Sequence, residues 1–302
     1  MSSLIEQAAQ RLEQLRRAGV DVPETKTSLP QPAAAQVASP AAPRNRADHP
    51  EQPAASSRRV ELDLALLDAS GIVTPNAPRS QIADEFRVIK RPLISNAMGR
   101  GAAALPHGNL IMITSAVSGE GKSFTSVNLA VSIAAELDHT VMLVDADVAR
   151  PSVLRMLGLP EGPGLLDLLE GKAEMANVML KTNVDKLTLL PSGTPHARAT
   201  ELLASEAMRL LLDDISKRYP DRIVIFDSPP LLLTTEARVL AAQMGQVVMV
   251  VQADKTLQAD VQQALATIES CPVKMMLLNK VRVEAKGKYG YGYGYGAKQQ
   301  AA

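Results

Sequence analysis

Cysteine, net charge and long apolar runs are what this sequence has least of. The single cysteine, Cys271, excludes a disulfide bond within the chain and fits a reducing compartment. Lysine plus arginine and aspartate plus glutamate number 32 each, so no global charge indicates nucleic acid as a partner. The longest apolar runs, around 110–117 and 247–251, are shorter than the ~18 to 20 residues that span a bilayer, and no secretory signal opens the chain. We therefore expect a soluble, cytoplasmic protein.

Composition divides the 302 residues into four segments. Residues 1–20 predict an amphipathic helix, whose apolar face would cover a partner, a membrane surface or the chain's own domain. Residues 21–58 are rich in proline and alanine and poor in large apolar residues, which predicts a disordered linker. Residues 59–285 hold the predicted folded domain, and residues 286–302 form a tail rich in tyrosine and glycine.

A glycine-containing loop is the strongest single signal in the folded segment. The stretch Ser115–Thr125 joins an apolar run to a helix-like segment, with Lys122 and Ser123 at the junction. In such a loop the backbone N–H groups and the helix N-terminus hold phosphate, the lysine reaches the terminal phosphates and the serine hydroxyl binds Mg²⁺. Ala116 stands where the generic pattern has its first glycine. The loop still predicts a nucleotide-phosphate site.

Apolar strands alternate with amphipathic helices from residue 109 onward. The predicted strands lie near 109–115, 140–145, 187–190, 222–227, 246–252 and 273–279. The predicted helices lie near 80–95, 122–137, 164–170, 200–218, 235–242 and 256–269, and the first of them has a charged, outward face of Asp84, Glu85, Arg87, Lys90 and Arg91. This pattern predicts an α/β P-loop NTPase fold, with a mainly parallel sheet covered by helices on both faces. Residues 60–67 are compatible with a strand or with an arm lying against the domain.

Two further predicted strands end in aspartate at the edge where the loop opens. Asp145 ends one strand, Asp147 follows two residues later, and Asp227 ends another. The carboxyl ends of parallel strands share one edge of a sheet. Carboxylates beside a phosphate-binding loop supply the oxygen ligands that Mg²⁺ prefers. Each aspartate alone is compatible with a helix cap or an ion pair, but together with the loop they indicate a site for magnesium and nucleotide.

Four of the five tyrosines lie in the alternating segment 289–296, at positions 289, 291, 293 and 295. Glycine alternation does not hold a strand, so we expect a flexible segment with exposed phenols. A low-complexity tail without a catalytic role and a phosphoacceptor segment both predict this flexibility. From Asn279 to Tyr289 the extended chain spans at most ~33 Å, which allows entry into its own site or a neighbour's.

Several motifs together resemble the bacterial tyrosine kinases, and most closely the CpsD/CapB-like autokinases that accompany exosortase-linked exopolysaccharide loci. The motifs are the loop 119–123, the aspartate segment 144–151, the strand end 226–230, the segments 190–193 and 201–203, the helix 4–19, the segment 84–93 and the tyrosine tail. The resemblance covers essentially the whole chain. It implies an ATP-dependent protein-tyrosine autokinase that phosphorylates its C-terminal tyrosines Tyr289, Tyr291, Tyr293 and Tyr295 and regulates exopolysaccharide polymerisation and export.

The resemblance also implies roles for individual residues. The implied catalytic residues are Lys122, Asp145, Asp147 and Asp227, of which Asp145 would orient or deprotonate the attacking phenol. The implied magnesium ligands are Ser123, Asp147 and Asp227. The implied contacts with ATP are Ser118, Gly119, Glu120, Gly121, Lys122, Ser123, Phe124, Arg150 and Asn279. Asn279 would read adenine, although a strand-end turn residue is the alternative.

Relatives assemble through an acid-x-x-Arg-x-x-Arg pattern that Asp84, Arg87 and Lys90 resemble. Lysine at the last position lacks the bidentate fork of arginine. The resemblance implies a homo-oligomeric ring with phosphorylation between subunits. It also implies activation by a membrane-embedded polysaccharide chain-length determinant, or co-polymerase, that brings the protein to the inner face of the cell membrane.

Two other functions are compatible with a P-loop. A MinD- or ParA-like ATPase switch would carry an additional lysine early in the loop, where this chain has Val117, and MinD-like proteins end in a membrane-binding helix rather than in tyrosine and glycine. A scaffold that binds nucleotide without turnover would not need the complete aspartate set. Both alternatives lack tyrosine kinase activity, so a phosphotyrosine assay separates them from the kinase.

Overall fold

The computed structural model describes residues 58–75, 80–101, 105–219 and 221–282, which lie in one unit of the chain, Gln52–Ala302. The predicted N-terminal helix, the linker up to residue 57 and the tyrosine tail lie outside the described residues. Within the described ranges, no helix has both the length and the apolar character that crossing a membrane requires.

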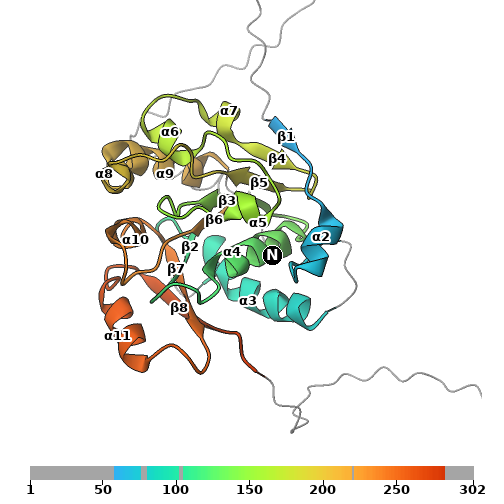
Figure 1. Cartoon of the computed structure of the whole chain (residues 1–302), viewed down its shortest axis with the longest axis vertical. Helices are drawn as coiled ribbons and strands as arrows, with labels where there is room; N and C mark the ends of the chain where they lie inside the picture. Colours follow the sequence, from blue (N-terminus) through green and yellow to red (C-terminus); the bar gives the residue numbers. More distant parts are fainter. Residues whose placement is uncertain (1–57, 76–79, 102–104, 220, 283–302) are drawn as a thin grey trace, which may run out of the picture. The chain divides into compact units, whose positions relative to one another are not determined.

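A sheet of eight strands forms the centre of this unit (Figure 1). The strands are β1 (Arg58–Val60), β2 (Leu110–Ser115), β3 (Thr140–Asp145), β4 (Leu180–Thr182), β5 (Leu187–Leu190), β6 (Arg222–Asp227), β7 (Gln246–Gln252) and β8 (Val273–Asn279). Their spatial order is β1-β4-β5-β3-β6-β2-β7-β8, and every neighbouring pair is parallel except β4 and β5. The predicted P-loop NTPase fold with a mainly parallel sheet is confirmed.

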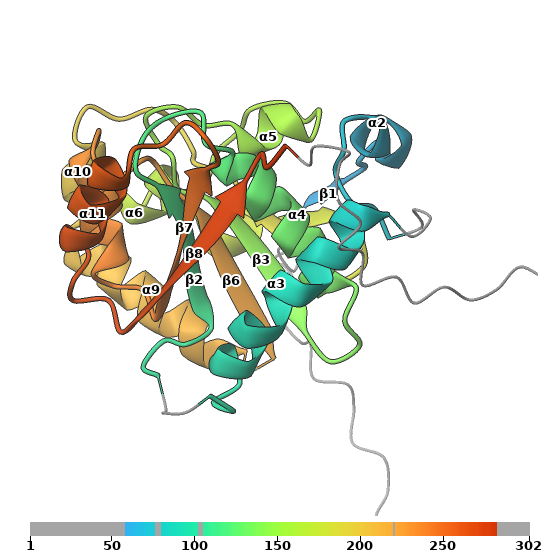
Figure 2. The ribbon, with the colours of Figure 1, turned by 90° about the horizontal axis from the view of Figure 1, so that it is seen from below.

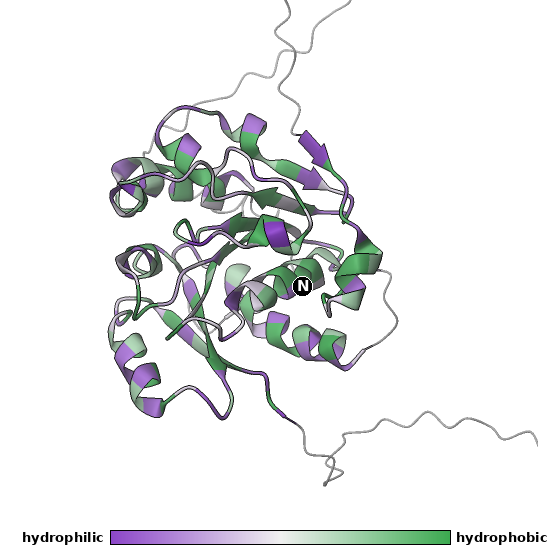
Figure 3. Ribbon diagram, in the orientation of Figure 1, coloured by the Kyte–Doolittle hydropathy of each residue, from purple (hydrophilic) through white to green (hydrophobic). Residues whose placement is uncertain are grey.

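Helices cover both faces of the sheet (Figures 1 and 2). One apolar core involves α2 (Leu64–Ala69), α3 (Gln81–Ala97), α4 (Lys122–Ala134) and α5 (Val153–Met156). The other involves α6 (Leu165–Leu169), α7 (Met175–Val178), α8 (Ala199–Leu203), α9 (Glu206–Arg218), α10 (Thr235–Ala241) and α11 (Gln258–Ala266). In keeping with coverage of both faces, the central strands are mainly apolar, as the hydropathy colouring of Figure 3 shows.

Two predicted elements differ from the structure. Residues 60–67 do not form a continuous strand, because the Asp63 side chain accepts hydrogen bonds from the N–H groups of Ala65 and Leu66 and caps α2. They do lie against the domain, since Leu62 and Leu67 are 3% exposed and belong to the core that contains α3. The predicted helix 200–218 is two helices, since Ser205 is extended and caps α9 through the N–H of Met208.

The short strand β4 was not predicted, and it is antiparallel to β5 for a simple reason. Only residues 183–186 separate the two strands, and a connection of that length reverses the chain but does not cross back over the sheet. Lys186 has a positive φ of 63° in this turn. With only three residues, β4 is too short to give a periodic signal in the sequence.

The predicted outward position of Lys90 on α3 is wrong. Lys90 is 4% exposed, and its Nζ bonds to Glu136 Oε1 at 2.7 Å and to the Ser132 carbonyl at 2.5 Å, both at the end of α4. Three-residue steps fall ~60° short of a full helical turn, so position 90 drifts into the buried stripe of Ala83, Phe86 and Leu93.

The remaining members of the predicted oligomer face are exposed. Asp84 and Arg87 pair with each other on the surface of α3. Lys90, in contrast, packs inside its own subunit, so the oligomer face that the sequence predicts loses its third member.

We expect Glu136→Gln to reduce the free energy of unfolding more than Lys90→Met does. The first change leaves the buried ammonium group without its anion, and we expect a loss of about 2 kcal/mol. The second replaces the ammonium group by an apolar chain of similar length. It leaves Glu136, whose side chain is 22% exposed, within 3.4 Å of Arg91. We expect it to cost less than about 1 kcal/mol.

Urea denaturation of both variants measures this difference. Equal losses in Glu136→Gln and Lys90→Met would contradict the conclusion that the buried charge of Lys90 depends on Glu136.

Candidate nucleotide and phosphoryl-transfer site

The loop between β2 and α4 has the backbone of a phosphate-binding loop. Gly119 and Gly121 have φ values of 85° and 102°, which side chains with a Cβ rarely adopt. A Cβ on Gly121 would also lie 2.2 Å from Nδ2 of Asn279. Lys122 begins α4 and is 9% exposed, and its positive charge partly offsets the rise in pKa that burial causes at Asp147 and Asp227. The loop, the helix N-terminus and the lysine are therefore brought together at one place.

The side chain of Glu120 is turned into the protein. It is 1% exposed, and its carboxylate accepts hydrogen bonds from Val117 N at 2.9 Å, Gln252 N at 3.2 Å and the hydroxyl of Thr256. These bonds fix the bend of the loop and fasten it to the end of β7. They also hold the side chain within the protein, so that only the backbone of Glu120 is left for the predicted contact with nucleotide.

The end of β8 lies beside the same loop. Nδ2 of Asn279 donates to the carbonyl of Glu120 at 2.9 Å, and Nζ of Lys280 donates to the carbonyl of Gly119 at 2.6 Å. Asn279 is thus held at the loop, and its Oδ1 also accepts the N–H of Lys280 at 2.8 Å, as expected of a strand-end turn residue. The adenine contact stays a prediction. Lys280 was not predicted, because no sequence pattern singles it out.

The two aspartates that end β3 and β6 lie side by side on these neighbouring strands. Asp145 and Asp227 are register partners, and they are 1% and 0% exposed. Oδ2 of Asp145 accepts the N–H groups of Ser152 and Val153 at 3.0 Å each, and Oδ1 of Asp227 accepts the Ser126 hydroxyl at 3.0 Å. The other oxygen of each carboxylate, Asp145 Oδ1 and Asp227 Oδ2, is buried without a hydrogen-bond partner.

Burial raises the pKa values of these carboxyl groups. The pKa of Asp145 rises from 3.8 to about 7, mainly by desolvation and further by the charge of Asp227. The pKa of Asp227 rises to about 6 by desolvation, against the opposing effect of the nearby hydroxyl groups of Ser123 and Ser126. Desolvation also raises the pKa of Asp147, which is 8% exposed. The site is therefore short of positive charge, and a cation would stabilise it.

The donor set fits magnesium. Two buried carboxylate oxygens lack partners, and the hydroxyl of Ser123 lies beside Asp227, which gives the hard oxygen ligands that Mg²⁺ prefers. Within the described part of the chain, no three His, Cys, Asp or Glu side chains form a ready-made metal cage. A magnesium ion would therefore be held jointly by the protein and by nucleotide phosphates, as is usual for this ion.

The other residues predicted to contact ATP differ in how far they are buried. Ser118, Gly119 and the side chain of Arg150 are exposed at the mouth of the site, and the N–H of Arg150 donates to Asp147 Oδ1 at 3.1 Å. The ring of Phe124 packs against the core that contains α2 and α3, so its predicted contact with nucleotide is left to its backbone.

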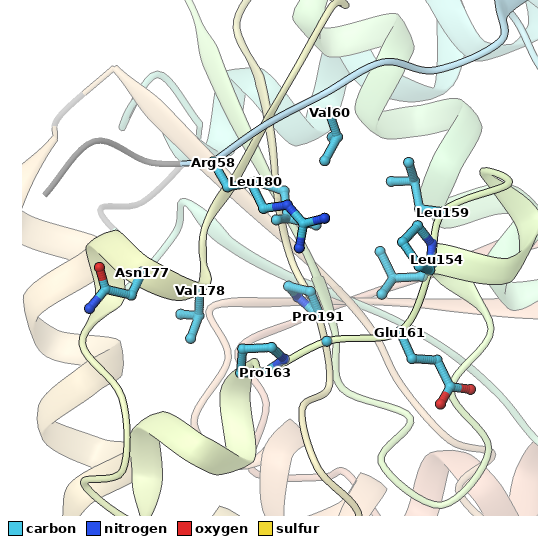
Figure 4. A pocket seen from close by; sticks show the side chains of 12 residues that line it. Arg58, Val60, Leu154, Leu159, Glu161, Pro163, Asn177, Val178, Leu180 and Pro191 are labelled. Carbon is cyan, nitrogen blue, oxygen red and sulfur yellow. The ribbon is translucent and has the colours of Figure 1, made fainter.

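A separate small cavity of about 40 Å³ lies next to α5 and α7 (Figure 4). Its lining is mainly apolar and includes Leu154, Val178 and Leu180, and its charged residues are Arg58 and Glu161. It contains neither the glycine loop nor the aspartates, so it is distinct from the nucleotide site.

A phosphate-binding loop between β2 and α4, with aspartates at the ends of two neighbouring strands, defines a P-loop NTPase domain. In agreement, the protein family described as AAA domain matches residues 108–281.

Comparison with individual proteins narrows this class. The chain is 30% identical to tyrosine-protein kinase YwqD of Bacillus subtilis (strain 168) over 205 residues, which cover 68% of this chain and 83% of that protein. It is 32% identical to tyrosine-protein kinase CpsD of Streptococcus agalactiae over 176 residues, covering 57% and 75%. It spans only 25% of the longer tyrosine-protein kinase ptk of Acinetobacter johnsonii.

Solved structures give the same result. The chimerical protein CapA2B2 aligns with a TM-score of 0.58 at 27% identity, covering 73% of this chain and 93% of that one. The kinase domain of Escherichia coli tyrosine kinase ETK aligns with a TM-score of 0.57 at 25% identity, covering 76% and 98%. The chain belongs to the bacterial tyrosine kinases of the CpsD/CapB type, and it is therefore an enzyme.

Proposed function

We propose that the protein is an ATP-dependent autokinase that phosphorylates Tyr289, Tyr291, Tyr293 and Tyr295 of its own C-terminal tail. The observation that carries this proposal is the pair of buried, unpartnered oxygens on Asp145 and Asp227. They lie at the edge of the sheet where Lys122 and the glycine loop meet, so one site combines phosphate binding with carboxylates that could hold a metal ion and a phenol.

In this mechanism the loop and Lys122 hold the phosphates of ATP. Ser123, Asp147 and Asp227 would hold a magnesium ion, which would neutralise the charge of the phosphates. Asp145 accepts the hydrogen bond of the incoming phenol and orients it. A new bond forms between the phenol oxygen and the γ-phosphorus, the bond to the β–γ bridging oxygen breaks, and its electron pair leaves with ADP.

The proton of the phenol moves late in the reaction. The ordinary pKa of a phenol is about 10, whereas the pKa of Asp145 is about 7. Asp145 is therefore the weaker base until the phenol oxygen bonds to phosphorus, and it takes the proton as that bond forms. Its burial makes it a better acceptor than an exposed aspartate.

The position of the end of β8 supports access of the tail to the site. Lys280 directly follows β8, and its hydrogen bond to Gly119 places the last described residues of the chain beside the phosphate-binding loop. We propose that phosphorylation occurs between subunits of a ring, with the exposed pair Asp84 and Arg87 as part of the contact. Lys90 is not part of that contact.

The cellular role proposed here follows from the family resemblance. The kinase would regulate exopolysaccharide polymerisation and export at the inner face of the cell membrane. A membrane-embedded chain-length determinant would bind it and stimulate phosphorylation.

Incubation of the purified protein with ATP and Mg²⁺, followed by phosphotyrosine detection, tests the proposal. We expect a signal from the wild type and none from a variant with all four tail tyrosines changed to phenylalanine, in which Tyr219 remains as an internal control. A silent wild type, also with the activator present, would reject the kinase activity. An undiminished signal in the tail variant would reject the tail as acceptor.

A mixture of two variants tests transfer between subunits. One carries Lys122→Met with an intact tail, and the other carries the four tail substitutions with an intact site. Phosphotyrosine in the mixture is expected under transfer between subunits, whereas a silent mixture beside an active wild type would indicate transfer within one subunit.

A further inference from the structure

Ser152, at the start of α5, contacts two groups of the site at once. Its hydroxyl lies 2.7 Å from the hydroxyl oxygen of Ser123, and its N–H donates to Asp145 Oδ2 at 3.0 Å. Ser152 lies outside the glycine loop and was not predicted as a site residue. Ser152 therefore connects Ser123, the proposed magnesium ligand, with Asp145, the proposed catalytic carboxylate.

Helix capping does not explain the hydroxyl. Ser152 occupies the N-cap position of α5 (Val153–Met156), where a serine side chain usually accepts a hydrogen bond from the first turn. Here the side chain makes no such bond. Its partner is Ser123, 29 positions away in the chain.

The hydrogen bond from Ser152 restricts the orientation of the Ser123 hydroxyl. A serine hydroxyl has one hydrogen to donate and two lone pairs. The hydrogen bond from Ser152 occupies one of these lone pairs. The other lone pair remains for a metal ion, and the bond from Ser152 restricts the rotation of the Ser123 side chain that aims it.

The backbone of Ser152 acts on Asp145 in a parallel way. The N–H groups of Ser152 and Val153 both bind Oδ2, and Oδ1 is left without a partner. One carboxylate oxygen is thus anchored at the start of α5, while the other stays available for the reaction.

We propose that Ser152 is a positioning residue that orients the magnesium-binding oxygen of Ser123 and the free oxygen of Asp145 with respect to each other. The inference rests on the proposed magnesium and ATP site, and it assigns that site an outer-sphere partner. Outer-sphere partners of this kind fix the geometry of a metal ligand, and their loss typically weakens metal binding by about 10- to 100-fold.

Binding of a fluorescent ADP analogue during a magnesium titration tests the proposal. Ser152→Ala removes the hydroxyl and keeps the N–H to Asp145. We expect it to raise the Mg²⁺ concentration at the binding midpoint by about tenfold, with unchanged affinity for the analogue in EDTA. Ser152→Thr, which keeps the hydroxyl, is expected to retain the wild-type midpoint.

Ser216→Ala is the matched control. Ser216 is also a half-buried serine whose hydroxyl donates to one side chain, Asn109, but it lies at the other end of the sheet on α9. Its removal is expected to leave the magnesium midpoint unchanged. If Ser152→Ala did not fold, Ser152→Cys, with a weaker donor of similar size, would be expected to give an intermediate shift.

An unchanged midpoint in a folded Ser152→Ala protein would overturn the proposal. Equal weakening of analogue binding with and without Mg²⁺ would also overturn it, because that result indicates general damage to the loop. The titration does not use phosphotyrosine. Absence of tail phosphorylation in the wild type would therefore reject the proposed autokinase function without deciding the role of Ser152.

Discussion

Replacing Lys122 by methionine is expected to reduce tail phosphorylation by about a hundred- to a thousandfold while the protein stays folded. Lys122 is 9% exposed at the start of α4, where its charge would meet the phosphates of ATP. Methionine has a similar length and no charge, so the change removes the electrostatic interaction and largely preserves the packing. Phosphotyrosine detection after incubation with ATP and Mg²⁺ measures the loss.

Lys122→Arg tests whether the positive charge alone is sufficient or whether the shape of the ammonium group is also required. Arginine keeps the positive charge, but its planar guanidinium group is bulkier than an ammonium group in a nearly closed site. We expect it to retain less than about a tenth of the wild-type signal. Full activity in a folded Lys122→Met protein would show that the loop does not position the phosphates for transfer.

Asp145→Asn is expected to abolish phosphorylation and, in metal-free protein, to raise the free energy of unfolding at pH 8. The folded state raises the pKa of Asp145 from 3.8 to about 7, so the folded protein binds this proton more tightly than the unfolded chain. The wild type therefore loses stability as the pH rises from about 4 to about 7. Asparagine does not ionise, so the variant does not undergo this loss.

The stability difference should depend on pH in a defined way. Below pH 4 the two proteins are expected to have similar stability, and above pH 7 the variant should be more stable by about 2 to 4 kcal/mol. Urea denaturation in EDTA at a series of pH values measures it. The same pH dependence in both proteins would contradict the burial of an unpaired carboxylate at this position.

The sequence predicted the central part of the fold because its strands are long, apolar and bounded by clear turns. The strands β2, β3, β6, β7 and β8 match the predicted ranges within one residue. The elements that were missed, such as β1 and α7, have three and four residues, and no periodicity can be read from such lengths. The ambiguous region after β1 was decided by a single capping side chain, Asp63.

The site residues that could be predicted are those at the carboxyl ends of strands. Asp145 and Asp227 could be placed beside the loop because the carboxyl ends of parallel strands share an edge. The roles of Glu120 and Ser152 could not be derived in this way, since they depend on contacts with Thr256 and Ser123, which are distant in sequence. A sequence pattern gives the type of residue at a site but not the direction in which its side chain points.

Lys90 shows a different reason for an error. A charge pattern with three-residue spacing was read as one exposed face, but a helix has 3.6 residues per turn, and the third charge turns inward. The buried position is stable only because Glu136 and the end of α4 provide partners, and the sequence around Lys90 contains no sign of them.

Phosphate mapping on the intact wild-type protein after incubation with ATP and Mg²⁺ tests the central claim most directly. The account predicts up to four phosphates per chain, all on Tyr289, Tyr291, Tyr293 and Tyr295 and none on Tyr219, and it predicts none in Lys122→Met. Conversion of ATP to ADP by wild-type protein that carries no phosphate, with the activator present, would contradict it and would indicate an ATPase switch instead.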